Sequence, residues 1–460
     1  MGRLDFLPPM HAFGERYELP IPLYLFVLGG VLVVIASFVV TLRRAPAPAP
    51  VADVEDVVPP LALRPVRAAV GLVLTVAVGI VGATGLQEIP ENIAPTFFWL
   101  LIWIVVPLTC GLFGDWTRPW NPFANAGRLG DSAALRKSVL ARQQPLAWSP
   151  RVGWWPAVVM FVLLVLGELV FNKTTTTKPA FVGISLLTYL FASFVMGLVF
   201  GPAWLARGEV FSALFNAWGR LGFWRQGAPG RRGFGGGLDV PFQTSWSRVV
   251  FVLLLLISIN FDGLLATPQW ANYECRTFGV DARGIDGLRV ASLLVLMAIV
   301  LAVFLAFAVM SSRAGKLGRR PIAALADLLP SLVPIAYGYL IAHYLEYVVL
   351  NSQLLIPLLD NPGYDGFSFG LPSPFNDAYE VNRTVLPTSF YWYLSVAVIV
   401  AVHVAAVMLA NRRLAGRAAT KAEGRRAEYP WLVAMVAYTA FSLFLIAQPL
   451  TEKATQCSGF

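Results

Sequence analysis

One stretch of this sequence carries residues that could do chemistry inside a membrane. Within residues 327–353, Tyr339, His343 and Glu346 follow one another at spacings of four and three, which places them on one face of a helix. An imidazole and a carboxylate are costly in a bilayer unless they line a bundle interior or a wet cavity, so such residues mark a functional site by default. The alternative is that His343 and Glu346 hydrogen-bond to a neighbouring helix and fix its packing.

Other polar residues gather near the ends of neighbouring apolar runs. Glu168 closes one run and Asp262 closes another, both on the side of the membrane that the charge pattern below assigns to the outside. The sequence therefore predicts one polar pocket that opens outward. The pocket comprises His343, Glu346, Tyr339, Tyr347, Glu168 and Asp262. The alternative for Glu168 and Asp262 is a place in the wet interface, where polar residues are routine.

A metal site is a further hypothesis for this region. His403 is isolated in an apolar run, and a rise of 1.5 Å per residue puts His343 roughly 12 Å and His403 roughly 20 Å below the outer surface. If the helix ends shift enough to close that gap, His343, Glu346 and His403 form a set of two histidines and one carboxylate that suits zinc or iron. A divalent metal is therefore the one cofactor that the sequence suggests. A lone packing histidine is the alternative for His403.

The composition predicts that membrane-spanning helices position these residues. The chain has 460 residues, of which 57% are hydrophobic and only 13% charged, so it is far too apolar for a soluble protein of this size. Runs of about 20 apolar residues are the expected membrane-spanning helices. We predict an all-α, polytopic transmembrane helix bundle that forms a single domain over residues 1–460. Its ten spans are 20–42, 68–86, 93–114, 153–171, 180–200, 247–266, 287–310, 326–350, 388–410 and 430–448.

The charge pattern predicts the topology. The net charge is +9, but the basic residues gather in alternate loops, after the first, third, fifth, seventh and ninth spans. By the positive-inside rule these loops are cytoplasmic, and an even number of spans then places both termini outside. The cytoplasmic segments are a Pro/Ala-rich linker at 43–67 and two loops at 115–152 and 202–246. This distribution favours the lipid bilayer as the partner and excludes nucleic acid, whereas protein partners stay unknown.

The two long cytoplasmic loops resemble each other. One reads FGDWTRPWNPFANAGRLG from Phe113 and the other FGPAWLARGEVFSALFNAWGRLG from Phe200, with a period of 87 residues between the phenylalanines and 91 between Asn125 and Asn216. This pattern indicates an internal duplication of a helix pair in one orientation, and internal repeats are common in transporters. Chance similarity is the alternative. In the second copy, apolar residues at helical spacing predict an interfacial helix near 208–223.

Three cysteines complete the inventory of reactive side chains. Cys275 and Cys457 both fall outside under this topology, where an oxidising exterior permits a disulfide between them. Two unpaired thiols are the alternative. Cys110 lies in the third span and is a small core residue.

Three segments together suggest a family. They are the external segment with His11, Phe13, Gly14, Arg16 and Tyr17, the loop with Gly208 and Glu209, and the helix with His343 and Glu346. In these the chain resembles the fenitrothion-hydrolase-like polytopic membrane proteins of high-GC bacteria. The resemblance implies a multi-pass protein of the bacterial plasma membrane that cleaves an organophosphorus ester. It supplies no catalytic residues to carry over to this sequence.

Two functions follow from these observations. The first is a carrier that binds or transports a small solute or metal ion in the outward-facing pocket. The duplication favours it, and so does the lack of Gly-x-Ser-x-Gly, HExxH and Walker motifs in the sequence. The second is a membrane-bound, metal-dependent hydrolase in which His343 and Glu346 activate water against a phosphotriester.

Overall fold

The computed structural model describes residues 28–36, 64–171, 175–224, 233–239, 242–278 and 284–451. Every secondary-structure element in these residues is a helix, which confirms the predicted all-α class. The chain divides into two compact units. Unit 1 comprises residues 1–9, 57–237 and 347–385, and unit 2 comprises residues 10–56, 238–346 and 386–460.

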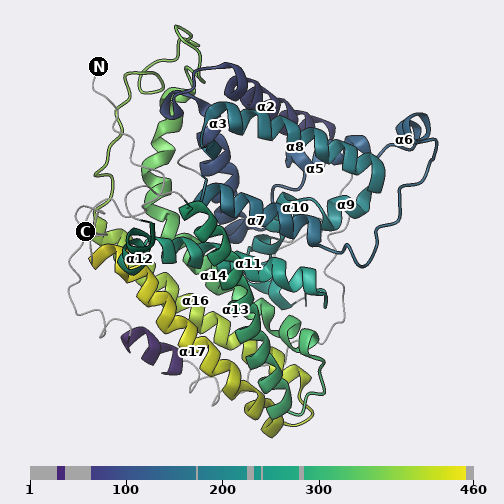
Figure 1. Ribbon diagram of the computed structural model, residues 1–460, viewed down its shortest axis with the longest axis vertical. Coiled ribbons are helices and arrows are strands. Elements are labelled where there is room, and N and C mark those ends of the chain that lie inside the picture. The colour runs from purple at the N-terminus through teal and green to yellow at the C-terminus, as the bar shows by residue number, and fades with distance from the viewer. Residues whose placement is uncertain are drawn as a thin grey trace. The chain divides into compact units, whose positions relative to one another are not determined.

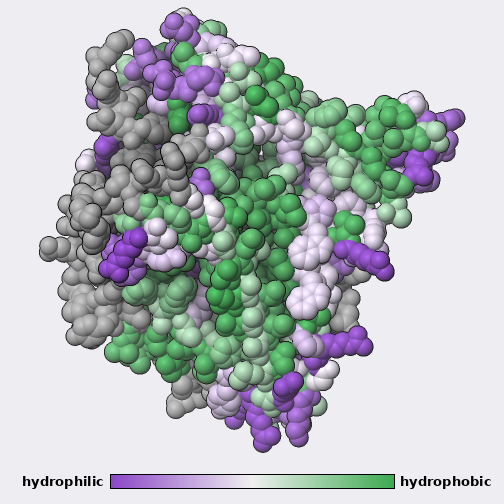
Figure 2. Space-filling model, viewed as in Figure 1, coloured by the Kyte–Doolittle hydropathy of each residue, from purple (hydrophilic) through white to green (hydrophobic). Residues whose placement is uncertain are grey.

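Eight helices in the described residues are long and apolar enough to cross a membrane. These are Pro65–Thr84, Ile93–Phe113, Pro179–Phe200, Trp246–Leu265, Ile285–Ala314, Pro321–Leu358, Ser389–Arg417 and Lys421–Leu445. Hydrophobic side chains dominate the exposed helix faces, and hydrophilic ones gather at helix ends and loops (Figure 2). Such surfaces are stable against lipid tails and unstable against water, so the chain is a multi-pass membrane protein.

Two of the ten predicted spans differ from these eight helices. The run at 153–171 forms α7, Trp155–Leu169, which is apolar but only 15 residues long. The run at 20–42 is described only over residues 28–36, which are helical. Most of the linker predicted at 43–67 lies outside the described residues, apart from its last residues at the start of α2.

Unit 1 is built on long helices that approach each other through glycines. Its main elements are α2 (Pro65–Thr84), η2 (Thr96–Val105), α4 (Val106–Phe113), α7 and α8 (Pro179–Phe200), with η1 (Ile89–Glu91) and α3 (Ile93–Pro95) between α2 and η2. α2 lies beside α8 (Figure 1). A Cβ on Gly183 of α8 would collide with backbone atoms of Gly79 and Gly82 on α2. Small residues thus let two membrane helices touch at their backbones.

Short helices complete unit 1 and exchange partners between the two duplicated loops. They are α5 (Pro122–Gly130), α6 (Ala133–Leu140), α9 (Pro202–Arg207) and α10 (Val210–Gly219), with η6 (Ser352–Leu354) and α15 (Leu355–Leu358) later in the chain. α5 follows α4 but packs on α8, whereas α10 follows α9 and packs on α4. A Cβ on Gly197 would collide with Gly127, and one on Gly222 with Gly114. The copies are therefore interlocked.

The second of these short helices corrects the prediction for residues 208–223. A helix does form at Val210–Gly219, but all of its ten residues except Ser212 and Asn216 are buried. An interfacial helix would bury one face only. The buried environment comes from packing on α4, α7, α9 and α5, which a hydropathy pattern within residues 208–223 does not reveal.

Unit 2 is a second helical bundle. Its elements are α11 (Trp246–Leu265), α12 (Pro268–Phe278), α13 (Ile285–Ala314), α14 (Pro321–Asn351), α16 (Thr388–Arg417) and α17 (Lys421–Thr451). Residues of α14 up to Glu346 belong to unit 2, as do the last two residues of η4 (Gly236–Asp239). α17 lies beside α13 and α16 (Figure 1). Val34 of the described segment 28–36 packs with Val407 of α16 and with Val436 of α17. α11 and α14 are buried over most of their length, whereas α13 exposes a broad apolar face.

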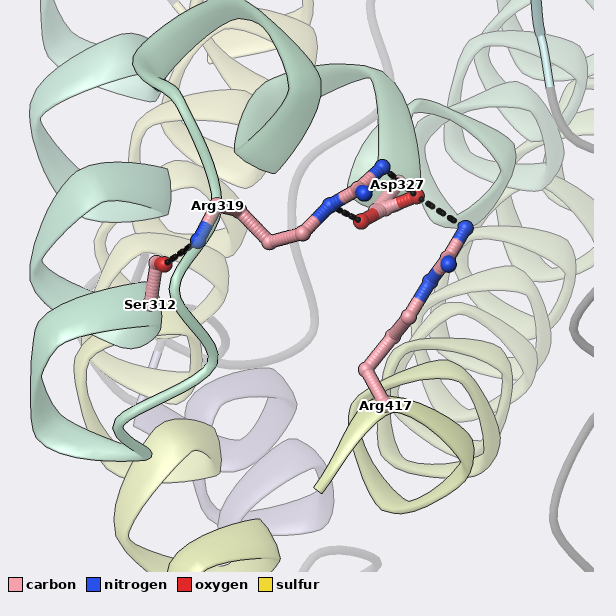
Figure 3. A network of polar contacts seen from close by, with 4 residues as sticks. All are labelled: Ser312, Arg319, Asp327 and Arg417. Atoms are coloured by element: carbon pink, nitrogen blue, oxygen red, sulfur yellow. Dashed lines mark hydrogen bonds and ion pairs between the residues drawn. The ribbon is translucent and has the colours of Figure 1, made fainter. Parts of the chain in front are cut away.

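A buried ion-pair network joins three helices of unit 2 at one end (Figure 3). Arg319 donates to both carboxylate oxygens of Asp327, with its Nε 2.8 Å from Oδ2 and its Nη2 3.3 Å from Oδ1. Arg417 of α16 donates to Oδ1 from 3.0 Å. The backbone N–H of Arg319 donates to Ser312 at the end of α13. The aspartate on α14 thus holds two permanent cations, a paired arrangement that can offset the cost of burial.

Candidate functional site

A helical hairpin in unit 1 enters the bundle and turns inside it. After α8 ends at Phe200, the chain runs back through α9, so that the indole of Trp204 donates to Ser193 from 3.0 Å. At the turn, the N–H of Val210 donates to the hydroxyl of Tyr189 from 3.3 Å. Tyr189 precedes the end of α8 by 11 residues, which is about 16 Å along a helix. The turn thus lies about 16 Å from the end of α8, measured along that helix.

The loop after α4 makes a matching hairpin. The chain turns after α4 and starts α5 beside Ser193, whose hydroxyl donates to the carbonyl of Phe123 from 2.9 Å. α5 ends where Gly130 meets the backbone of Phe194 and Leu198. It therefore runs in the same direction as the last turns of α8. Both short helices begin inside unit 1 and end level with the ends of the long helices beside them.

The two hairpin tips meet, and each is capped by its own side chain. The side-chain Oδ1 of Asn121 accepts from the N–H groups of Phe123 and Ala124 at the start of α5. The Glu209 carboxylate accepts from those of Phe211 and Ser212 at the start of α10, at 3.0 and 2.7 Å. These are ordinary N-caps, which satisfy N–H groups that a helix leaves unpaired and place negative charge at its positive end.

Glu209 connects the two tips. Its Oε2 also accepts from the amide Nδ2 of Asn121 at 3.1 Å, and its Oε1 accepts from the hydroxyl of Tyr189 at 3.1 Å. The residue is fully buried, with 0% of its surface exposed. Four donors thus surround one carboxylate, and because they come from both hairpins and from α8, the carboxylate fixes how the tips meet.

A cavity of about 540 Å³ lies over these tips in unit 1. The rings of Phe123 and Phe211, from the first turns of α5 and α10, stack at 4.7 Å and line it together with Tyr189. The rest of the lining comes from η2, α7, α8 and the connection between α7 and α8: Phe98, Trp99, Met160, Leu163, Leu164, Leu166, Gly167, Phe171, Thr176, Phe181, Val182, Ile184, Ser185, Leu186, Thr188 and Ala192. Its size and its apolar lining with a few hydroxyl groups are typical of small-molecule pockets.

A buried carboxyl stands near the end of the first hairpin's long helix. Asp115 follows α4 and accepts a hydrogen bond from the Thr117 hydroxyl at 2.7 Å. Burial raises the pKa of Asp115 to about 6, and hydrogen bonding to Thr117 and the charge of Arg118 oppose that rise. Gly219 at the end of α10 lies against Asp115, where a Cβ would be 2.7 Å from the aspartate Cβ. Burial, to which α10 contributes through Gly219, therefore causes the shift.

In unit 2 the structure brings together two of the residues predicted for the polar pocket. Nε2 of His343 on α14 lies 2.6 Å from Oδ2 of Asp262 on α11. The hydroxyl of Tyr344 donates to the same oxygen from 3.2 Å. Both members of the His343–Asp262 pair are largely buried, with 13% and 10% of their side chains exposed. The pair joins the two most buried helices of the unit.

A second polar group lies one turn away on α14. Asn260 of α11 donates to the hydroxyl of Tyr438 on α17, and the Tyr438 ring lies 6.5 Å from that of Tyr339. The Asn260 Oδ1 and the Tyr339 hydroxyl are buried and have no hydrogen-bond partner within the described part of the chain. Because Tyr339 precedes His343 by four residues, both side chains emerge from the same face of α14.

The remaining pocket residues divide between the two units. Glu346 belongs to unit 2, where it is buried and lies within electrostatic range of Tyr391 on α16. Glu168 and Tyr347 belong to unit 1 and lie within electrostatic range of each other. The Trp103 indole donates to Glu168 from 2.7 Å. A single pocket formed by all six predicted residues stays a prediction.

The structure does not assemble the predicted metal ligands. In the described ranges, no three His, Cys, Asp or Glu side chains lie close enough to hold one ion, and His343, Glu346 and His403 are all in those ranges. His403 is fully buried, and its Nδ1 lies 2.7 Å from the carbonyl of Ile399 on its own helix. That contact is the packing role weighed as the alternative for this residue.

The cysteines agree with the predicted environments as far as they are described. Cys110 is free and buried in α4. Cys275 on α12 is disulfide-bonded. Cys457 lies outside the described residues, so its pairing with Cys275 stays a prediction.

Sequence reasoning missed several residues of these sites. Tyr344 lies off the stripe that Tyr339, His343 and Glu346 form, yet it reaches Asp262. Tyr438 stands in an apolar run, where neither it nor its neighbour Thr439 carries a charge that would single it out. Glu209 was noted only for the resemblance, although its place before a run of helical apolar residues is a recognisable N-cap signal.

Comparison with known proteins gives no relative: no family model matches the chain, and no curated protein or solved structure has detectable similarity to it.

Proposed function

We propose that this protein is a membrane carrier that takes up an apolar or amphipathic small molecule in the unit 1 cavity. The observation that carries the proposal is the cavity of about 540 Å³ whose lining includes the first turns of two buried helices. That volume lies within the range of about 300–1,000 Å³ that small-molecule pockets occupy. The plasma-membrane location, the ten spans and the outward termini predicted from the sequence are part of this proposal.

The hairpin architecture supports a carrier. Transporters bind substrates near mid-membrane at the interface of internal repeats, where discontinuous helices end. Here the repeats are the two copies that begin at Phe113 and Phe200, and the discontinuous helices are α5 and α10. Their tips meet through Asn121 and Glu209. The cavity therefore adjoins the element on which such carriers depend.

The lining supports an apolar or amphipathic solute. Side chains along α8 from Phe181 to Ala192 line the cavity, a length of about 16 Å. Ile184 and Leu163 line it too and are also 55% exposed, so the cavity borders the surface that faces lipid. A molecule dissolved in the membrane could enter there. Ser185 and Thr188 in the lining carry hydroxyl groups that can hydrogen-bond a polar group of the solute.

This proposal differs from the carrier that the sequence suggested, which binds a small solute or metal ion in the polar pocket at His343 and Glu346. A hydrated metal ion or a strongly polar solute would lose its water in this cavity without receiving equivalent ligands. The hydrolase alternative continues to rest on the resemblance alone.

The proposal is tested by extracting the protein without detergent, so that a bound small molecule is retained. Wild-type protein taken from its membrane in polymer-bounded lipid discs is analysed by native mass spectrometry for bound small molecules. We expect a species near one per chain. Ala192→Trp, which fills the cavity, is expected to lose it. Phe191→Trp is the matched control, because Phe191 is on the same helix, is 68% exposed and does not line the cavity.

Equal occupancy in wild type and Ala192→Trp would reject the cavity as the binding site. Transport is then tested with the identified species in liposomes that contain the protein. Accumulation across the bilayer supports the carrier. Chemical conversion of that species by wild type but not by Ala192→Trp would instead favour an enzyme.

A further inference from the structure

The pair formed by Asp262 and His343 in unit 2 differs from an ordinary structural ion pair. In the described part of the chain, the side-chain partners of Asp262 are His343 at 2.6 Å and Tyr344 at 3.2 Å. No Lys or Arg contacts this carboxylate among those residues. Neither partner carries a permanent charge, so the charge of the pair depends on how many protons it holds.

The contact distance limits the protonation states. A carboxylate oxygen and an imidazole nitrogen 2.6 Å apart require a proton between them, because both atoms are otherwise acceptors. With that proton alone the pair has a net charge of −1. A second proton on the imidazole makes the pair neutral without breaking the Nε2–H···Oδ2 hydrogen bond. The pair can therefore hold one or two protons with its Nε2–Oδ2 contact unchanged.

Nearby polar atoms indicate a route for water to this pair. The Oδ1 of Asn260 and the hydroxyl of Tyr339 are buried without a hydrogen-bond partner among the described residues. Leaving such groups unsatisfied in a dry interior costs about 1–3 kcal/mol each, and ordered water is the usual solution. Tyr339 stands one turn from His343 on the same helix face, so water bound there lies next to the pair.

The surroundings provide few competing charges. The titratable groups that face this region are Tyr344 and Glu346 on α14, Tyr438 on α17 and Tyr391 on α16. α13 contributes the ring of Phe304, which packs 5.7 Å from that of Tyr438. Glu346 is the other acidic group among them.

We propose that Asp262 and His343 form a proton-binding site inside unit 2, which exchanges one proton through water held by Tyr339 and Asn260. Buried acid–histidine groups in membrane helices are typical of proton relays in pumps and transporters. The site would allow the protein to couple its work to a proton gradient. It rests on unit 2 alone and stands whether or not the unit 1 cavity binds a solute.

The small number of histidines makes a direct test practicable. The chain has three, so protein labelled with ¹⁵N-histidine and reconstituted in lipid gives few solid-state NMR signals. His343→Gln assigns the signal of interest. We expect that signal to change reversibly from neutral imidazole to imidazolium between about pH 8 and about pH 5, the range in which histidine titrates. His403 is an internal reference that we expect to stay neutral.

Variants at the two buried aspartates of unit 2 decide the outcome. Asp262→Asn removes the charge that stabilises the imidazolium, so the imidazolium fraction of His343 at about pH 6 should fall by about tenfold or more. Asp327→Asn, which alters a carboxylate that contacts Arg319 and Arg417 instead, should leave it unchanged. A His343 signal that never changes with pH overturns the proposal, as does one that titrates equally in wild type and Asp262→Asn. Failure of the cavity test above leaves these signals unaffected.

Discussion

Two buried aspartates in unit 2 have nearly equal exposure and different partners. Asp327 on α14 is held by Arg319 and Arg417, and its side chain is 8% exposed. Asp262 on α11 is held by His343 and Tyr344, and its side chain is 10% exposed. Burial alone therefore does not set the role of an intramembrane acid. The decisive difference is whether its partners can lose their charge.

The stability lost when each carboxylate is neutralised depends on the charge of its remaining partners. Removing one member of a buried pair with permanent charges strands the other charge, which costs about 3–5 kcal/mol. Removing the charge of Asp262 strands no permanent cation, because His343 can become neutral. We therefore expect Asp327 to act in stability and Asp262 in proton exchange. The predictions below test this ranking and extend it to the buried acids of unit 1.

The largest effect is expected for Asp327→Asn. The amide removes the negative charge between two guanidinium groups, so the folded state should lose about 3 kcal/mol. Thermal unfolding can be followed with a thiol-reactive dye, because Cys110 is free and buried. Asp365→Asn is the control, since Asp365 is exposed. If Asp327→Asn and Asp365→Asn melt at the same temperature, Asp327 does not stabilise the fold and the contrast with Asp262 fails.

Asp115 in unit 1 should give a pH-dependent effect of similar size. Since its pKa is raised to about 6 from an ordinary value of 3.8, the folded protein binds the proton more tightly than the unfolded chain. The resulting destabilisation is complete above about pH 6 and disappears as the pH falls toward 3.8, a change of about 3 kcal/mol.

Asp115→Asn should abolish this pH-dependent contribution. The measurement is the difference in melting temperature between variant and wild type, taken at about pH 7 and again at about pH 4.5. We expect the variant to be favoured relative to wild type at the higher pH. A difference that does not change with pH would show that the carboxyl stays charged.

A smaller effect is expected for Glu209→Gln. In the wild type, Oε2 of Glu209 accepts from the Ser212 N–H and from the Asn121 side-chain amide. Glutamine places an NH₂ group at that position, so these two donors lose their acceptor. Loss of charge-assisted hydrogen bonds of this kind costs about 1.5–3 kcal/mol. Glu380→Gln is the exposed control. Unfolding of both variants at the same temperature would mean that the carboxylate does not hold the tips together.

The smallest change in stability is expected for Asp262→Asn. An amide oxygen can still accept from neutral His343 and from Tyr344, so the loss should be under about 1 kcal/mol. The same thermal assay measures it beside Asp327→Asn. If the two asparagine variants lose equal stability, Asp262 is a structural acid and the contrast between the two sites fails.

Much of this fold was predictable because hydropathy reports long lipid-facing helices directly. Eight of the ten predicted apolar runs correspond to helices long enough to cross a membrane. The short helices α5 and α10 were not predicted as buried elements. Each has only nine or ten residues and stands beside charged residues such as Arg118 and Glu209, so each resembles a loop. Their burial arises from packing across the duplication.

The sequence predicts site residues only where burying the side chain in a membrane helix costs free energy. His343 and Asp262 stood out because ionisable groups are rare in membrane helices. Their distance could not be derived, since it depends on how α11 packs on α14. The cavity gave no signal, because its lining consists of apolar residues that any span contains. His403 gave a false signal as a ligand, because its bond to the carbonyl of Ile399 cannot be read from spacing.

The exchange of partners between the two hairpins sets an order of assembly during synthesis. α4 leaves the ribosome about a hundred residues before α10, the helix that packs on it. Until then Asn121 lacks Glu209, and Asp115 lacks Gly219 of α10. A nascent chain truncated between α9 and α10 should therefore insert its long helices yet leave unit 1 open to proteases. Synthesis of Glu209 and α10 is the step that joins the two hairpin tips.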